Sequence, residues 1–117
     1  MGEPRDREAL AVVADHLGAV ATGDPEAMAA DYAADAVLVR DVTYEGRDAI
    51  AGYFATVPDR LGEGQVEFAE PRLDGDQVAV AWRLVGGPGD GTSGTDRFEV
   101  TNGLITRQTV TLNTPDF

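Results

Sequence analysis

Apolar residues near the start of the chain recur at spacings of three and four, which is the pattern of an amphipathic helix. They are Leu10, Val13, Ala14, Leu17, Val20 and Ala21. Gly23, Asp24 and Pro25 follow, and these residue types suit a helix C-cap, an N-cap and a first helical turn. The sequence therefore predicts a helix over 6–22 and a second, short helix over 25–35.

After the second helix, the sequence predicts a strand at 36–42 and a third helix at 45–61. From about residue 65 the pattern changes to alternating apolar and polar residues, which is typical of strands. The expected later strands are 65–73, 77–85, 94–100 and 104–112. Asn102-Gly103 favours a tight hairpin turn, because both residue types tolerate positive φ. Helices followed by antiparallel strands predict an α+β fold with three helices on one face of a strongly curved sheet.

Asp96 is the residue that does not fit this alternation. Side chains alternate along a strand, so Asp96 falls on the same face as Phe98 and Val100, which are apolar. An unpaired buried carboxylate is costly, so Asp96 must lie at a wet edge, be paired, be protonated or face a cavity. A structural ion pair with Arg40 or Arg107 is the alternative to a functional acid.

Composition excludes several classes of protein. The length of 117 residues, with 43% hydrophobic and 26% charged residues, predicts one globular domain over 1–117. Nine basic and 21 acidic residues give a formal net charge of −12, which argues against nucleic acid or an anionic membrane as partner. No apolar run approaches the ~20 residues of a membrane span, and the N-terminus lacks a signal-peptide core, so a cytoplasmic location is expected.

The numbers of cysteine and histidine residues limit the metal and thiol chemistry that the chain could carry out. The chain contains no cysteine, which excludes disulfides, thiolate catalysis and cysteine metal sites. It contains one histidine, which excludes a zinc site with several histidines. No metal or organic cofactor is implied.

Four short segments carry a resemblance to a known superfamily. They are ATGD at 21–24, YAADAVL at 32–38, GRDAI at 46–50 and FEVTNGLI at 98–105. Over residues 8–112 the chain resembles the nuclear transport factor 2-like superfamily, and within it the ketosteroid isomerase-like and SnoaL-like polyketide cyclase branch. The resemblance implies a cone-shaped, barrel-like α+β domain with an apolar pocket between the helices and the concave sheet. It does not select a reaction, because this fold hosts several kinds of enzyme as well as binding proteins.

The resemblance also suggests which residues form a site. In ketosteroid isomerases an aspartic acid at the position of Asp96 is held protonated and donates a hydrogen bond to the dienolate oxygen. The second donor, a tyrosine on the first helix, is matched by His16, and a neighbouring aromatic on helix two by Tyr32. The family's base, an aspartate on the first strand, is matched by Arg40, with Asp41 next to it. An arginine cannot act as a base near neutral pH, so either a bulge turns Asp41 inward or the protein does not catalyse steroid isomerisation.

Each of these residues also has a purely structural interpretation. His16 falls at the edge of the first helix's apolar stripe, where it could simply bond a backbone carbonyl, and Tyr32 could be a core aromatic with a satisfied hydroxyl. Phe54 and Trp82 line either the core or a pocket wall. On the functional interpretation, the residues that contact substrate are Tyr32, Phe54, Trp82, Phe98 and Arg107.

The resemblance implies an enzyme that transfers protons on an apolar carbonyl compound, such as a steroid-like or polyketide ring. Asp96 and His16 would stabilise an enolate oxygen, Asp41 would be the base, and Asp96 is expected to be protonated at neutral pH or to have a strongly raised pKa. The alternative is a non-catalytic ligand-binding or assembly domain in which Arg40 pairs with Asp96. Expected partners are a small apolar ring-containing ligand and, through the outward sheet face that carries Arg97, a second copy of the chain in a homodimer.

Overall fold

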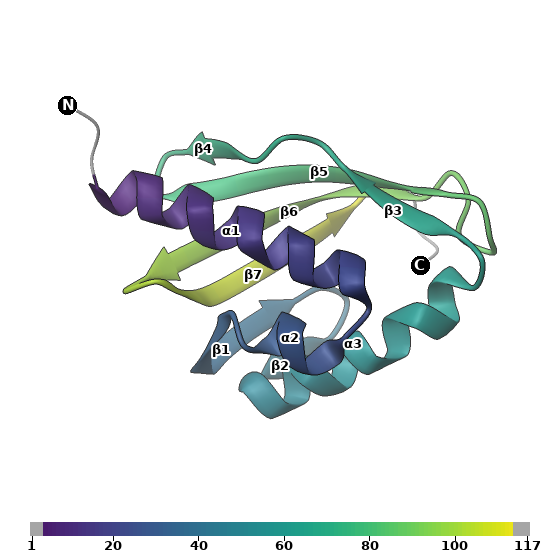
Figure 1. Cartoon of the computed structure of the whole chain (residues 1–117), viewed down its shortest axis with the longest axis horizontal. Helices are drawn as coiled ribbons and strands as arrows, with labels where there is room; N and C mark the ends of the chain where they lie inside the picture. The colour runs from purple at the N-terminus through teal and green to yellow at the C-terminus, as the bar shows by residue number, and fades with distance from the viewer. Residues whose placement is uncertain (1–3, 114–117) are drawn as a thin grey trace.

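The computed structural model describes residues 4–113, in which helices cover one face of a curved sheet (Figure 1). The helices are α1 (Pro4–Thr22), α2 (Pro25–Ala29) and α3 (Arg47–Leu61). The strands are β1 (Tyr32–Val39), β2 (Thr43–Glu45), β3 (Gln65–Phe68), β4 (Arg72–Asp74), β5 (Gln77–Val85), β6 (Ser93–Thr101) and β7 (Leu104–Leu112). The predicted α+β fold class is confirmed.

The strands of this sheet follow the order β2-β1-β7-β6-β5-β3, and β4 pairs with the first residues of β5, on the same edge of that strand as β3. β1 runs parallel to β7, and the other pairings are antiparallel. The register of β6 against β7 shifts between Glu99 and Val100, and such irregularities bend a sheet and increase its twist. The sheet is therefore curved but not closed, and its concave face receives the helices.

Several sequence predictions about element boundaries were wrong. The strand expected at 36–42 ends at Val39, and β2 occupies residues 43–45, before the third helix begins at Arg47. The second helix ends at Ala29 instead of continuing to 35, and Tyr32 begins β1 (Tyr32–Val39). Tyr32 pairs with Ile105 of β7, so sheet pairing overrides the helix propensity of this alanine-rich segment. The expected strand at 65–73 is divided into β3 and β4 around Pro71, which has no N–H to donate to the ladder.

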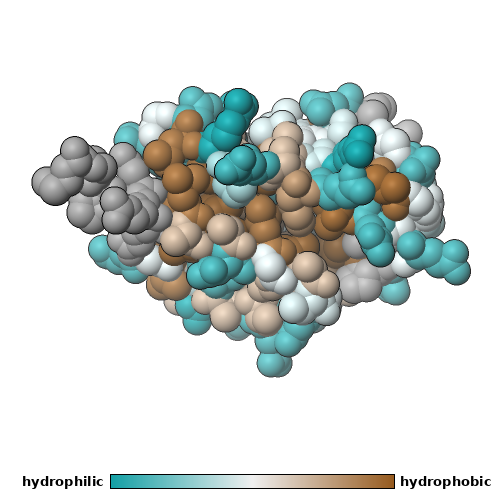
Figure 2. Space-filling model, turned by 45° about the horizontal axis from the view of Figure 1, so that its top comes forward, coloured by the Kyte–Doolittle hydropathy of each residue, from teal (hydrophilic) through white to brown (hydrophobic). Residues whose placement is uncertain are grey.

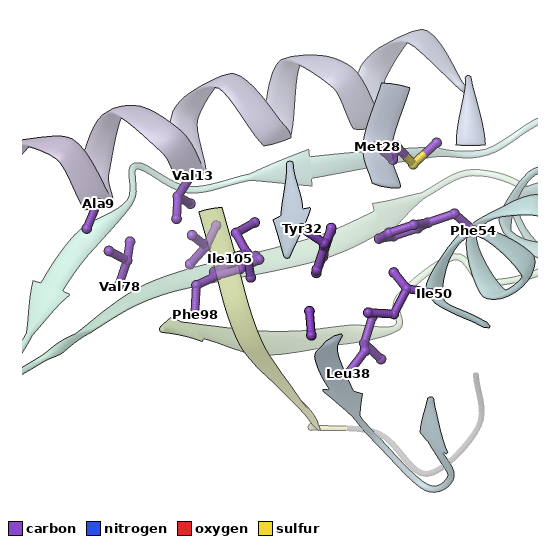
Figure 3. Close-up of a cluster of buried hydrophobic side chains, with 12 residues drawn as sticks. Ala9, Val13, Met28, Tyr32, Leu38, Ile50, Phe54, Val78, Phe98 and Ile105 are labelled. Carbon is purple, nitrogen blue, oxygen red and sulfur yellow. The ribbon is translucent and has the colours of Figure 1, made fainter. Parts of the chain in front are cut away.

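α1 crosses the concave face of the sheet, and α3 packs against α2, β1 and β2 (Figure 1). Figure 3 shows Val13 of α1 beside Phe98 and Ile105, and Tyr32 and Phe54 towards the other end of the core. His16 is 1% exposed, so it lies inside the buried face of α1 and not at its edge as the stripe suggested. Its polar ring must therefore find partners inside the core.

The hairpin between β6 and β7 confirms two expectations. Asn102 and Gly103 have φ of 54° and 80°, as a tight turn with two left-handed residues requires. Along β6, Gly94, Asp96 and Phe98 are buried and the residues between them are less so. Asp96 therefore does point towards the core.

Hydrophobic residues gather across the middle of one face of the molecule, with hydrophilic residues around them (Figure 2). Among the described residues, no helix combines the length and the apolar character that a membrane crossing requires.

We predict that Gly94→Ala destabilises the protein by about 1–3 kcal/mol, because a Cβ there would overpack the sheet. That Cβ would lie 2.6 Å from Thr111 O and 2.6 Å from Trp82 Cζ2. Gly94 and Trp82 are direct partners in the pairing of β5 with β6. Urea unfolding measures the loss, and the fluorescence of Trp82 should change with it because the indole must move.

Gly18→Ala in α1 is the matched control for this experiment. A Cβ at Gly18 meets nothing within 4 Å, so this variant should be unchanged or up to about 1 kcal/mol more stable. Equal unfolding free energies for the Gly94 variant and the wild type would contradict the close packing of the indole on β6.

Candidate active site

A cavity lies between α1, α3 and the concave face of the sheet. Its volume is about 90 Å³, several times the ~10–15 Å³ that one water needs by the same measure. Most of its lining side chains are aliphatic or aromatic, and the polar ones are His16, Arg40, Tyr53, Asp96 and Gln108. An apolar cavity with a few convergent polar groups is the usual form of a small-molecule site.

Asp96 of β6 is the acid of this cavity, and it is 9% exposed. Its Oδ1 accepts a hydrogen bond of 2.9 Å from Trp82 Nε1 of β5, and its Oδ2 accepts one of 3.0 Å from Gln108 Nε2 of β7. Burial raises the pKa of Asp96 to about 6, while these two bonds and the charge of Arg40 oppose the rise.

The expectation that Asp96 is protonated at neutral pH or has a strongly raised pKa is met by its second part, because burial raises the pKa to about 6. Both donors to the carboxylate are uncharged, which differs from the ion pair with Arg40 or Arg107 considered as the alternative.

His16 lies in the same cavity, but both of its ring nitrogens have partners. Nδ1 lies 3.3 Å from Asp31 Oδ2, and Nε2 lies 3.3 Å from the hydroxyl of Tyr32. The rings of Phe54 and Phe98 pack around it, with centroids 5.7 and 5.8 Å away. These contacts hold the imidazole in place, so a ligand meets its ring and not a free nitrogen.

Gln108 connects the histidine side of the cavity with the aspartate side. Its Oε1 accepts a hydrogen bond from the hydroxyl of Tyr32, and its Nε2 donates to Asp96. Burial, and then the charge of Asp96, hold the pKa of Tyr32 well above its usual range, so this hydroxyl keeps its proton. A continuous line of hydrogen bonds thus joins Asp31, His16, Tyr32, Gln108 and Asp96.

After β1 the side chain of Arg40 is buried and that of Asp41 is exposed, and Arg40 Nε lies 3.2 Å from Asp41 Oδ1. The side chain of Arg40 is 3% exposed, lines the cavity and donates a 2.9 Å hydrogen bond from Nη1 to the hydroxyl of Tyr53. The side chain of Asp41 is 75% exposed and accepts from the backbone N–H of Val42. Alternation explains this, because Arg40 continues the buried face of Leu38. The expectation that Asp41 turns inward as a base is thus corrected.

Arg107 also lies away from the cavity. Its side chain is 49% exposed and its Nε lies 3.9 Å from Glu99 Oε2. On β7, the side chains of Gln108, Val110 and Leu112 line the cavity. Because side chains alternate along a strand, that of Arg107 lies on the other face of the sheet. Of the other residues expected to contact a substrate, Phe54, Trp82 and Phe98 line the cavity, whereas Tyr32 lies behind it as a link in the hydrogen-bond line.

Sequence reasoning missed Gln108, Tyr53 and Asp31. Gln108 had a usable signal, because it shares its parity on β7 with the apolar Val110 and Leu112. The sequence held no such signal for Tyr53 or Asp31. The position of Tyr53 depends on how α3 is rotated, and that of Asp31 depends on where α2 ends. In the part of the chain that the structure describes, no group of three or more His, Asp and Glu side chains could hold a metal ion.

Comparisons with known proteins agree with this fold. The sequence model of the SnoaL-like domain matches residues 13–108. A crystal structure of a candidate polyketide cyclase from Sinorhizobium meliloti is 25% identical, with a TM-score of 0.73, covering 85% of this chain and 92% of that one. The chain matches no protein in a comparison with curated proteins.

Two further crystal structures show similarity of fold. An NTF2-like protein of unknown function from Mesorhizobium loti has a TM-score of 0.81 at 17% identity, covering 97% of this chain and 98% of that one. A candidate isomerase of the SnoaL-like family from Agrobacterium tumefaciens has a TM-score of 0.74 at 22% identity, covering 92% and 99%. The helices and the curved sheet are thus shared over almost the full length of these chains.

The buried carboxylate predicts a particular dependence of stability on pH. Between pH 3.8 and about 6, folded Asp96 holds more protons than unfolded Asp96, so the free energy of unfolding falls as pH rises through this window. Above pH 6 the difference is constant, at about 3 kcal/mol. Asp96→Asn removes this effect, so its stability relative to the wild type should increase by up to about that amount between pH 4 and pH 7.5.

Urea unfolding of both proteins across this range is the measurement, and their difference cancels the titration of the other carboxylates. Asp76→Asn, in the exposed turn before β5, is the matched control and should run parallel to the wild type. A parallel profile for Asp96→Asn as well would mean that the carboxyl titrates alike in both states.

Proposed function

The chain belongs to the SnoaL-like domain family, within the NTF2-like superfamily, and on that premise we propose that it is an enzyme that moves protons on an apolar carbonyl compound. The observation that carries the proposal is Asp96, a buried carboxylate facing a mostly apolar cavity with a pKa of about 6. A general base works best when its pKa lies near the working pH, and this value meets that condition.

In the proposed reaction, ionised Asp96 accepts a proton from a carbon next to the carbonyl group. The electron pair of the broken C–H bond moves into the carbonyl and gives an enolate, whose negative charge lies on oxygen. Arg40 and Tyr53 line the same cavity, and the N–H groups of Arg40 would stabilise the charge on that oxygen. Charged and polarised donors in a site with little water stabilise such a charge strongly.

Two outcomes follow from this enolate. Where the enolate is conjugated with a C=C bond, neutral Asp96 can return its proton to the far carbon, which isomerises the substrate. Alternatively the enolate carbon attacks a second carbonyl group of the same molecule, which closes a ring, and the alkoxide that forms takes the proton from Asp96. Both begin with the same proton transfer, and the residues of the cavity do not distinguish them. The apolar lining favours a substrate with rings and few charges, such as a steroid-like or polyketide compound.

A non-catalytic binding domain is the second candidate, and one observation favours it. Each oxygen of Asp96 already accepts a hydrogen bond, so the carboxylate could simply be a satisfied structural group. On that view a ring compound binds in the cavity and leaves unchanged. The lone tryptophan of the chain lines the cavity, so quenching of its fluorescence reports binding without turnover.

We predict that the protein isomerises a cyclic β,γ-unsaturated ketone and that its rate rises with pH through about pH 6, as Asp96 ionises. Both Asp96→Asn and Asp96→Ala should lower kcat/KM by roughly 100-fold or more, because neither side chain is a base. The ultraviolet absorbance of the conjugated product gives the rate, and deuterium uptake from solvent into the ketone detects proton abstraction alone.

Asp41→Asn is the control, because that exposed carboxylate should not contribute. Retention of most activity in Asp96→Asn but not in Asp96→Ala would identify Asp96 as a neutral donor and contradict the assignment as base. Quenching of Trp82 by such ketones, with neither isomerisation nor deuterium uptake, would favour the binding domain.

We also propose that two copies of the chain pair through the outward face of the sheet. Small side chains (Ala79, Ala81 and Thr95) line a shallow hollow there, which lets another sheet approach closely. Beside them Arg97 is paired with Asp74 of its own chain, so a partner need not neutralise it. Self-complementary pairing of one surface is the commonest form of homodimer.

Light scattering should then give twice the 12.3 kDa mass of one chain at micromolar concentration. Ala81→Glu should shift the mass towards one chain, because it places a charge at the centre of the paired surface. Ala21→Glu, at the exposed end of α1, should leave the dimer intact. A wild-type mass of 12.3 kDa would refute the proposed pairing.

A further inference from the structure

The residues that line the cavity change in character from one side of the sheet to the other. Arg40 lies at the end of β1 and Asp96 lies on β6, whereas the lining residues of β5 and β3 are apolar, namely Trp82, Leu84, Val66 and Phe68. Figure 1 shows β1 and β3 on opposite sides of β7, β6 and β5, as the strand order requires. The cavity therefore has a cation on one side, an acid in the middle and an apolar wall on the other side.

The register of the strands places Arg40 and Asp96 in one row across the sheet. Arg40 follows Val39, which pairs with Thr109 of β7, and Asp96 pairs with Val110, the next residue of β7. Neighbouring strands lie ~4.8 Å apart, so the backbones of Arg40 and Asp96 are about 10 Å apart, with Val110 between them. A ligand that meets both charged groups must therefore present different atoms to each of them along its length.

Arg40 is a buried cation that is held in a fixed position. Its side chain is 3% exposed, and its Nη1 donates a 2.9 Å hydrogen bond to the hydroxyl of Tyr53. The guanidinium carbon lies 5.4 Å from the centre of the same aromatic ring. Asp41, whose Oδ1 lies 3.2 Å from Nε, is 75% exposed, so solvent screens its charge. In a mostly apolar cavity a guanidinium attracts anions, and its planar fork of N–H groups suits a carboxylate in particular.

We propose that the cavity binds a small 2-oxo acid with an apolar ring on C3, and that Arg40 is the residue that selects the acid group. The carboxylate and the 2-oxo oxygen are neighbours in such a molecule, so both can accept hydrogen bonds from the guanidinium. C3 then lies over Val110 and towards Asp96, and the ring extends to Trp82 and Phe68. The order of groups along the molecule thus matches the order of side chains across the sheet.

The volume of the cavity favours one ring over several. It is about 90 Å³, well below the ~300–1,000 Å³ of pockets for drug-sized ligands. A single ring with a three-carbon acid is among the smallest compounds that carry a carboxylate, a carbonyl group and an apolar end. A system of fused rings requires a larger cavity than this one.

As the assignment of a substrate, this inference rests on the proposed function, because it names the carbonyl compound on which Asp96 acts. Ionised Asp96 takes a proton from C3, the electron pair of that C–H bond moves to the 2-oxo oxygen, and Arg40 stabilises the enolate. Neutral Asp96 then gives the proton to the same oxygen, and the enol leaves. One C–H bond is broken and one O–H bond is formed, so the reaction consumes no second reactant.

Asp96 opposes the binding of an anion, and this gives the inference a second consequence. Burial raises the pKa of Asp96 to about 6, so at pH 7.5 this group is ionised and shares the cavity with the carboxylate of the ligand. Like charges repel, and Asp96→Asn removes one of them. This variant should therefore bind an acid more tightly than the wild type does, although it lacks the base.

Calorimetry with two probes of the same shape tests the inference. The first, 3-phenylpropanoate, carries a ring and a carboxylate, and the second, 3-phenylpropanamide, has a neutral amide in place of the carboxylate. At pH 7.5 we expect the wild type to bind the acid roughly 10-fold more tightly than the amide, because hydrogen bonds between charged partners are the stronger ones. Equal affinities, tighter binding of the amide, or no binding of the acid at millimolar concentration would overturn the inference, and this comparison requires no variant.

Arg40→Met and Arg107→Met form a matched pair of variants. Each replaces an arginine with an apolar side chain, but Arg107 is 49% exposed and lies on the other face of the sheet. Arg40→Met should lose the preference for the acid, and Arg107→Met should keep it. A preference that persists in folded Arg40→Met would contradict the role of Arg40.

Asp96→Asn tests where the acid group lies. It should bind 3-phenylpropanoate several-fold more tightly than the wild type does and bind the amide about equally, because only the acid is repelled by the carboxylate. Unchanged or weaker binding of the acid would place it outside the cavity that Asp96 faces and would overturn the proposed orientation.

Turnover separates this inference from the proposed function. Phenylpyruvate, a 2-oxo acid with a phenyl ring on C3, should exchange its C3 hydrogens with deuterium oxide faster with the wild type than in buffer, as proton NMR measures, and Asp96→Asn should not accelerate the exchange. Preference for the acid without faster exchange would support the binding assignment and contradict the proposed enzyme. Faster exchange of an uncharged cyclic ketone, in a protein with no preference for the acid, would support the enzyme and overturn this inference.

Discussion

A carboxylate inside an apolar core is tolerated only if each of its oxygens is satisfied, and this constraint organises the centre of the sheet. Asp96 of β6 accepts one hydrogen bond from β5 and one from β7, from Trp82 and Gln108. The indole of Trp82 reaches Asp96 by lying over Gly94, because a Cβ at that position would clash with the indole ring. The register of the three central strands is thus tied to one charge, because a slip of one residue would leave that charge unpaired.

The same constraint extends beyond the sheet. Gln108 has two polar ends, so satisfying Asp96 obliges its oxygen to find a donor, and Tyr32 of β1 supplies one. Tyr32 in turn reaches His16 of α1, and His16 reaches Asp31 at the edge of the core, where the side chain is 27% exposed. A polar line crosses an otherwise apolar interior, and it fixes how α1 is placed on the concave face.

Much of this architecture could be predicted from sequence, because it depends on local alternation. The limits of β5 and β7, the turn at Asn102-Gly103 and the inward direction of Asp96 all follow from residue types and spacing. The partners of Asp96 do not, since they come from strands whose register the sequence does not fix. The sequence predicts Tyr32 on the second helix, one turn after Met28, and only its pairing with Ile105 makes it part of a strand.

Arg40 is the point at which this chain departs from the isomerase pattern that it resembles, and its position changes the chemistry to be expected. A cation occupies the buried face where that pattern has its base, and the adjacent Asp41 is turned to solvent. The charge of Arg40 lowers the pKa of Asp96, which burial alone would raise further. The arginine therefore favours an ionised Asp96. In the proposed reaction such a carboxylate would take the proton, and the charge of Arg40 would stabilise the enolate that results, so the position of the pocket acid in the isomerases would here hold the base.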